Sequence, residues 1–91
     1  MKETIVVCDD EELIRWSLCA HLEQEGYRAI PASNGQEALD AVVAHSPALL
    51  LTDLKMPVMD GLTAMRELRK AGSVMPIVVL TAHGEIGRAH V

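Results

Sequence analysis

Apolar and polar positions alternate in blocks along the chain, and these blocks predict strands and helices in turn. Short apolar runs bounded by polar or turn-forming residues predict four strands, at Thr4–Cys8, Arg28–Pro31, Ala48–Thr52 and Ile77–Thr81. The segments between them predict three helices, at Glu12–Gln24, Gln36–His45 and Leu62–Lys70. A regular alternation of strand and helix indicates a parallel sheet with right-handed crossovers, so the chain is expected to be an α/β domain.

Residues at the predicted helix ends agree with these bounds. Gly26 and Gly72 follow the first and third helices, where glycine commonly ends a helix. Asn34, with Glu37 three residues later, has the pattern of a cap at the start of the second helix. The first helix carries one apolar residue per turn on a single face, at Ile14, Leu18 and Leu22. The run Leu49–Leu51 is apolar throughout, which predicts a strand covered on both faces.

Polar side chains stand where three of the predicted strands end. Asp9 and Asp10 follow the first strand, Asp53 follows the third, and Thr81 ends the fourth. Each has an ordinary explanation by itself, as an acidic helix start, a turn residue or a β-branched strand residue. Neighbouring strands lie about 4.8 Å apart, so three acids at adjacent strand ends would repel one another unless a cation joins them. We therefore expect a hard divalent ion with oxygen ligands, and magnesium is the first candidate.

Composition narrows the class of protein. The chain has 91 residues and a net charge of −5, and its Lys and Arg residues are scattered, so we expect one domain with no nucleic-acid surface. Cys8 and Cys19 are interpreted as small buried hydrophobic residues rather than as a disulfide. The sequence has neither a signal-peptide pattern nor an apolar run of membrane-spanning length, which predicts a cytoplasmic protein without membrane contact.

The acid pair and the segments LTDLKMPVMDG and LTAHGE, taken together, resemble the receiver domain of bacterial two-component response regulators. The segment ELIRWSL and the TAHG that begins at Thr81 resemble the nitrogen-regulation (NtrC) type, which precedes sigma-54-dependent AAA+ activator domains. The resemblance covers Met1 to about Glu85. It implies a flavodoxin-like (CheY-like) doubly wound parallel sheet of strand order 2-1-3-4, with the acids at the switch point between the first and third strands.

The resemblance also implies a phosphoacceptor. Asp53 would attack the phosphorus of a phosphohistidine on a sensor histidine kinase and form an acyl phosphate, switching a downstream output. Magnesium would be held by Asp10 directly, by Asp9 through water, by Asp53 and by the backbone carbonyl of Lys55. The protein would catalyse only its own magnesium-dependent phosphorylation and dephosphorylation, and would not be an enzyme acting on other substrates.

Three further roles come from the same resemblance. The Thr81 hydroxyl would donate to a phosphoryl oxygen and draw the loop after the fourth strand inward. The side chains of Lys55 and His83 would tune how fast water reaches the acyl phosphate.

The resemblance ends before the carboxyl terminus. Residues 86–91 do not resemble the fourth helix of a receiver, and they match the translation of a widely used sequencing adapter in one frame. We therefore expect a partial receiver at residues 1–85 and a non-native tail at 86–91. The fifth strand with its lysine, the last two helices and a carboxyl-terminal output domain, AAA+ and DNA-binding, would be missing. The fourth strand would then be a bare edge, and the stripe on the first helix would be uncovered.

Two other classes stay open. A phosphatase like the haloacid dehalogenases also forms an acyl phosphate on a strand-end aspartate, but it normally has a second acid two residues later, where this chain has Lys55. A receiver-like interaction module that accepts no phosphate is the other possibility. Turnover of a generic phosphomonoester would favour the phosphatase, and magnesium titration would separate the receiver from the interaction module.

Overall fold

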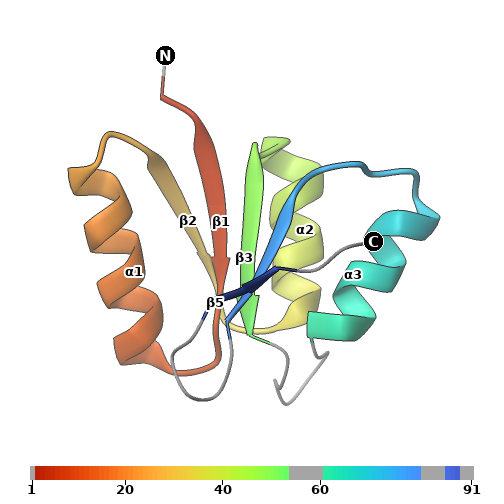
Figure 1. Cartoon of the computed structure of the whole chain (residues 1–91), viewed down its shortest axis with the longest axis horizontal. Coiled ribbons are helices and arrows are strands. Elements are labelled where there is room, and N and C mark those ends of the chain that lie inside the picture. Colours follow the sequence, from red (N-terminus) through yellow and green to blue (C-terminus); the bar gives the residue numbers. More distant parts are fainter. Residues whose placement is uncertain (1, 54–60, 81–85, 89–91) are drawn as a thin grey trace.

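The computed structural model describes residues 2–53, 61–80 and 86–88, which form one sheet flanked by helices (Figure 1). The sheet has five strands in the order β2-β1-β3-β4-β5. In chain order the elements are β1 (Thr4–Cys8), α1 (Glu12–Gln24), β2 (Arg28–Ala32), α2 (Gly35–His45), β3 (Leu49–Asp53), α3 (Gly61–Lys70), β4 (Ile77–Leu80) and β5 (Ile86–Arg88). The predicted α/β fold and strand order 2-1-3-4 are confirmed, with element ends shifted by at most one residue. None of the helices described is long and apolar enough to cross a membrane.

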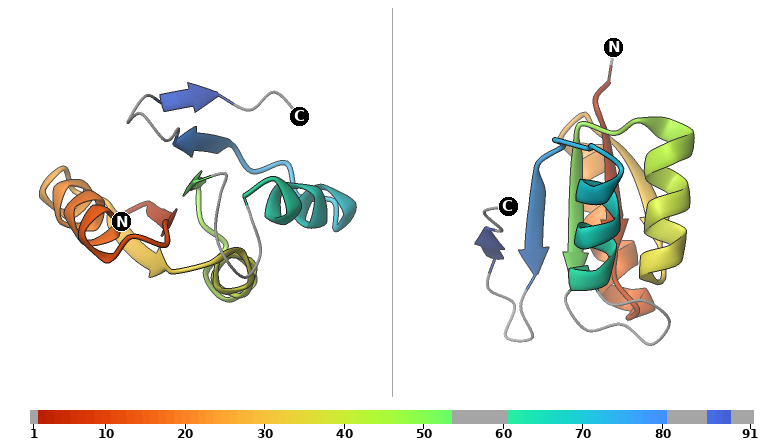
Figure 2. Two further views of the ribbon diagram at one scale, coloured as in Figure 1. Left: turned by 90° about the horizontal axis from the view of Figure 1, so that it is seen from below. Right: turned by 90° about the vertical axis from the view of Figure 1, so that its right-hand side faces the viewer.

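The helices lie in two layers, with α1 on one face of the sheet and α2 and α3 on the other (Figure 2). Alternate strand residues point to opposite faces, so each strand contributes every second side chain to one layer. The layer under α2 and α3 is the main core, and its strand residues are Val6, Cys8, Ala32, Leu50, Ile77 and Val79. Ala38, Met65 and Leu68 cover them from the helices. Full burial of one large aliphatic side chain stabilises a fold by about 1.5–3 kcal/mol, so this layer fixes the sheet.

The residues predicted to mark the helix ends do so in the structure. The Asn34 side chain accepts from the backbone N–H of Glu37 at 2.9 Å, and the Glu37 carboxylate accepts from the Ser33 N–H and hydroxyl at 2.8 Å. These bonds satisfy donors at the start of α2 that have no partner within the helix. Gly26 and Gly72, with φ of 95° and 87°, lie beyond the ends of α1 and α3 in the conformation that favours glycine.

The edge of the sheet differs from the expectation. Ile86–Arg88, part of the segment expected to be a non-native tail outside the fold, pairs antiparallel with β4, so β4 is not a bare edge. Only the five residues 81–85 separate these two strands. A parallel pair would need a crossover of about a dozen residues or more, whereas an antiparallel pair needs only a short turn. The fifth position of the sheet is therefore occupied, by a strand of opposite direction to the one that the resemblance implies.

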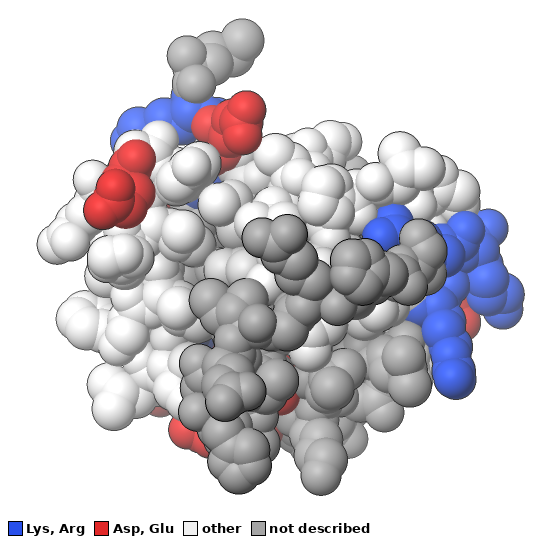
Figure 3. Space-filling view, viewed as in Figure 1, with Lys and Arg blue, Asp and Glu red and all other residues white. Residues whose placement is uncertain are grey.

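The face of the sheet that carries α1 is only partly covered by the residues described. Ile5 and Val7 are buried beneath α1, whereas Leu49, Leu51 and Val78 on the same face are half-buried. The prediction that Leu49–Leu51 is covered on both faces is therefore wrong for this face. The helix itself has no buried residue, and Ile14 of the predicted stripe is 41% exposed. In Figure 3 the surface over α1 and the adjoining sheet is largely uncharged.

This partly covered face predicts that the chain associates in solution. Leu13 and Trp16, 73% and 68% exposed, line an open hollow on α1 with Glu12 and would lose water contact in an associated state. We expect sedimentation at increasing concentration to show association that the double variant Leu13→Gln, Trp16→Gln reduces. Val74→Ser removes an even more exposed apolar side chain, between α3 and β4, and serves as the control. A monomeric wild type with a sharp, high thermal transition would contradict the expectation.

Candidate functional site

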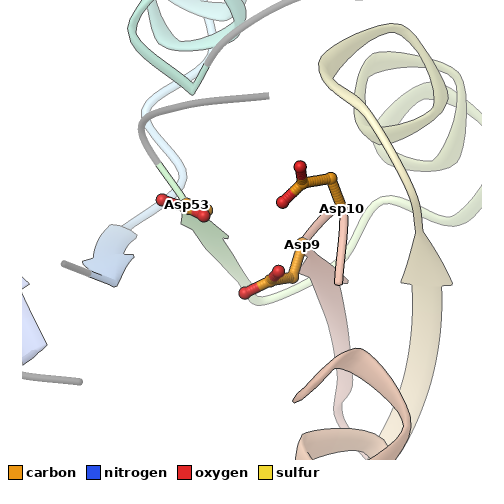
Figure 4. A group of neighbouring side chains, drawn as sticks. All are labelled: Asp9, Asp10 and Asp53. Carbon is orange, nitrogen blue, oxygen red and sulfur yellow. The ribbon is translucent and has the colours of Figure 1, made fainter. Parts of the chain in front are cut away.

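Three carboxylates meet at the carboxyl edge of the sheet, where β1 and β3 end (Figure 4). Cys8 of β1 is in register with Thr52 of β3, so Asp9, which directly follows β1, stands beside Asp53, the last residue of β3. Asp10 follows Asp9, and its carboxylate points toward the side where Asp53 lies. The juxtaposition that the sequence predicts for these three acids is thus present, and it results from the parallel register of two buried strands.

The three side chains have the geometry of a possible cation site. Each offers one carboxylate oxygen, and these oxygens all lie within 4.8 Å of one another. Two oxygens on opposite sides of a magnesium ion, each about 2.1 Å from it, are about 4.2 Å apart, so small side-chain movements would let one ion reach all three. The donor set consists of carboxylates alone, which suits a hard divalent cation rather than zinc or copper.

Asp9 is the most buried member of the cluster. It is 3% exposed, its N–H donates to the Ala32 carbonyl at 3.1 Å, and one of its carboxylate oxygens accepts from the Glu11 N–H at 2.9 Å. Its own carbonyl accepts from a guanidinium nitrogen of Arg15 at 2.8 Å. Burial raises the pKa of the Asp9 carboxyl, and the charges of Asp53 and Asp10 raise it further, while the Glu11 N–H opposes them.

Two buried polar residues support the site from behind. Cys8 and Thr52 are fully buried, directly before Asp9 and Asp53 in the sequence. The Cys8 thiol donates to the Asn34 carbonyl at 3.2 Å, and the Thr52 hydroxyl donates to the Asp53 carbonyl at 3.0 Å. Burial raises the pKa of the Cys8 thiol to about 11, so it stays protonated. Both cysteines are free, Cys8 buried and Cys19 half-buried, in agreement with the prediction that they form no disulfide.

Other expected site residues lie outside the residues described, namely Lys55, Thr81 and His83. Two residues near the site have no role in the sequence prediction. Arg15 lies one turn into α1 and reaches back to Asp9, and Thr52 lies under Asp53. Only the spacing of Arg15, six residues after Asp9, could have suggested its contact, because side chains on a helix lean toward its amino-terminal end.

Comparisons with known proteins place the chain in one family. Residues 5–90 match the model of the response regulator receiver domain. The chain is 47% identical over 85 residues to the probable transcriptional regulator ycf27 of Porphyra purpurea, covering 93% of this chain and 35% of that protein. It is 36% identical over 86 residues to sporulation initiation phosphotransferase F of Bacillus subtilis, covering 94% and 69%. It is 35% identical over 83 residues to the DNA-binding transcriptional regulator NtrC of Escherichia coli K12, covering 91% and 18%.

Solved structures agree with the sequence relatives. The amino-terminal domain of a response regulator receiver protein from Methanoculleus marisnigri superimposes with a TM-score of 0.83 at 38% identity, covering 88% of this chain and 67% of that one. The similar proteins include NtrC, ycf27 and a sporulation phosphotransferase. They agree on the receiver family, but they do not distinguish the nitrogen-regulation type from other types. The fold, the strand-end acids and the match over residues 5–90 together show that this chain belongs to the response regulator receiver domain family of two-component systems.

Proposed function

We propose that this receiver domain takes a phosphoryl group from a histidine kinase onto Asp53. The observation that carries the proposal is the position of Asp53 at the end of β3, with carboxylate oxygens of Asp9 and Asp10 within 4.8 Å of its own. A carboxylate there is held by a buried strand and stands among groups that favour a cation, which is what attack on an anionic phosphoryl group requires. Family membership supports this function over that of a dehalogenase-like phosphatase.

In the proposed step, a carboxylate oxygen of Asp53 forms a bond to phosphorus. The bond between phosphorus and the imidazole nitrogen of the kinase phosphohistidine breaks, and the nitrogen keeps the electron pair and takes a proton from solvent. The product is an acyl phosphate on Asp53. The phosphoryl group of the donor ends on the protein itself, so we propose a protein that promotes its own phosphorylation and dephosphorylation rather than an enzyme that acts on other substrates.

Asp9, Asp10 and Asp53 are the described residues that would hold a divalent cation, which we propose to be magnesium. Bound there, the ion would supply positive charge that offsets the repulsion between the acids and an incoming phosphoryl anion. The Lys55 backbone carbonyl as a further ligand, Thr81 as the phosphoryl-binding switch, and Lys55 and His83 as regulators of hydrolysis are parts of the same proposal. They rest on their positions in the sequence.

The output of the domain is proposed from its relatives. The chain spans 18% of the length of NtrC, 35% of ycf27 and 69% of the sporulation phosphotransferase, so these proteins differ in what accompanies the receiver. Two of the three are called transcriptional regulators. We propose a transcriptional output, with a sigma-54-dependent AAA+ activator suggested by the ELIRWSL segment of α1. A cytoplasmic location follows from the same proposal, since a sensor kinase and a gene regulator meet there.

The acceptor assignment predicts the behaviour of Asp53→Asn. Incubation with acetyl phosphate and magnesium should add one phosphate to wild type, detected by mass, and hydroxylamine should remove it because acyl phosphates react with this nucleophile. Asn cannot form the bond, so the variant should incorporate at least about 100-fold less phosphate. Asp40→Asn, an exposed acid on α2, should label like wild type. Hydroxylamine-sensitive labelling of Asp53→Asn at the wild-type level would contradict the assignment.

The ligand assignment predicts an order of magnesium affinities. If Asp10 binds the ion directly and Asp9 acts through water, Asp10→Ala should weaken magnesium binding more than Asp9→Ala does. The affinity of Asp10→Ala should fall at least about 10-fold below that of wild type. Calorimetric titration measures this without relying on Trp16, which lies on α1 and is exposed. The same affinity in wild type and both variants would rule out a cation site here.

The raised pKa of Asp9 predicts a pH-dependent stability change. Because the fold raises this pKa above its ordinary value of 3.8, folding favours the protonated form, and stability is lost as pH rises through the folded-state pKa. Asp9→Asn keeps the oxygen that accepts from Glu11 and removes the charge. Without divalent cations it should stabilise the protein at pH 7, where the wild-type carboxylate is charged, and the gain should vanish below pH 3.8, where Asp9 is protonated in both the folded and the unfolded protein. Denaturant unfolding at both pH values measures it, and a gain that persists at the lower pH would contradict the assigned cause.

A further inference from the structure

The side chain of Arg15 binds the backbone of the loop that carries Asp9 and Asp10. Its guanidinium donates to the Asp9 carbonyl at 2.8 Å in a partly buried contact. The Arg15 N–H meanwhile donates to the Glu11 carbonyl at 3.0 Å, the first turn of α1. Arg15 therefore ties the end of β1 to the start of α1 across the segment that carries both acids of the loop.

The carbonyl that Arg15 binds belongs to the peptide unit between Asp9 and Asp10. Six planar atoms make up that unit, so fixing its oxygen also fixes the direction in which the Asp10 Cα leaves it. The other side of Asp9 is already held by the bond from its N–H to Ala32. Asp10 is exposed, and its placement relative to Asp9 depends on the orientation of this peptide unit and of the next one, whose Glu11 N–H donates to the Asp9 carboxylate.

We infer that Arg15 is a positioning residue for the cation site, setting Asp10 against Asp9 through the Asp9 carbonyl without itself binding the ion. The inference rests on the proposed function for the identity of the ion. A guanidinium suits the task because it is always charged and can donate to a carbonyl in a fixed geometry. It also follows the acidic run at residues 9–12, where an unbound carbonyl would add to the negative potential.

Removing Arg15 should change the magnesium affinity in opposite directions, depending on whether the residue acts through its charge or by positioning the acids. If Arg15 acted only through its positive charge, removing it would tighten magnesium binding, because a nearby cation repels the ion. If it positions the acids, removing it should weaken binding although a repulsive charge is lost. The direction of the change in affinity therefore discriminates between the two roles.

The experiment compares the full 91-residue chain with Arg15→Gln, Arg15→Lys and the control Arg28→Gln. Arg28 is exposed at the start of β2, at the opposite edge of the sheet from the acids, and its loss changes net charge equally. By calorimetry, Arg15→Gln should bind magnesium about 10-fold more weakly than wild type, since loss of an outer hydrogen-bond partner of a metal site typically costs 10- to 100-fold in affinity. Arg15→Lys, which retains a charged donor, should stay within about threefold of wild type, and Arg28→Gln should match it.

Amide hydrogen exchange without divalent cations gives a second readout that does not depend on the metal. The Glu11 N–H, bound to the Asp9 carboxylate, should exchange at least about 10-fold faster in Arg15→Gln than in Arg28→Gln. The Leu50 N–H, bound to the Pro76 carbonyl in the core, should be unchanged and reports global stability.

Each outcome decides one question. Faster exchange at Glu11 alone, with weaker magnesium binding, supports the positioning role. Unchanged or tighter binding with unchanged exchange at Glu11 overturns it, as does an equal acceleration at Glu11 and Leu50, which would make Arg15 a contributor to overall stability only. A wild type that binds no magnesium would refute the cation part of the proposed function, and the exchange data would still judge the role of Arg15.

Discussion

Mutual repulsion among three carboxylates is the constraint on which the site depends. Asp9, Asp10 and Asp53 are brought together because β1 and β3 are parallel, adjacent and in register, and the burial of Val6, Leu50 and their neighbours enforces that register. The hydrophobic layer therefore holds in place a polar arrangement that is unfavourable by itself. Shifting the register by one residue would relieve the acids but would turn the buried side chains to the opposite face, which costs far more.

The three acids are not equivalent within this arrangement. Asp9 is almost fully buried and held through its N–H, its carbonyl and its carboxylate, whereas Asp10 is exposed. A cluster of this kind combines one fixed carboxylate with one that can adjust, which would suit a cation that demands near-ideal geometry. The Cys8 thiol and the Thr52 hydroxyl, on the residues directly before Asp9 and Asp53, each donate to a backbone carbonyl. These bonds limit how far the backbone of the two strand ends can move.

Local signals in the sequence account for most of what could be predicted. The caps at Asn34 and the glycines at 26 and 72 act through their own neighbours, and the apolar runs place Asp9 and Asp53 at strand ends wherever the sheet forms. The pairing of β5 could not be predicted this way, because a three-residue strand is stabilised by its partner rather than by its own pattern. The contact of Arg15 was missed for a similar reason, since the reach of a long side chain depends on how the helix leaves the strand.

The antiparallel strand β5 determines what kind of association the molecule can undergo. Hydrogen-bonding groups along β4 that would otherwise template a further strand are engaged by Ile86–Arg88, and a strand of three residues offers a neighbour very little edge in return. Edge-to-edge growth of the sheet from this side, a route to fibrils, is therefore disfavoured. The association expected through the half-covered apolar face beside α1 would involve side chains rather than backbone pairing, and it should reverse on dilution.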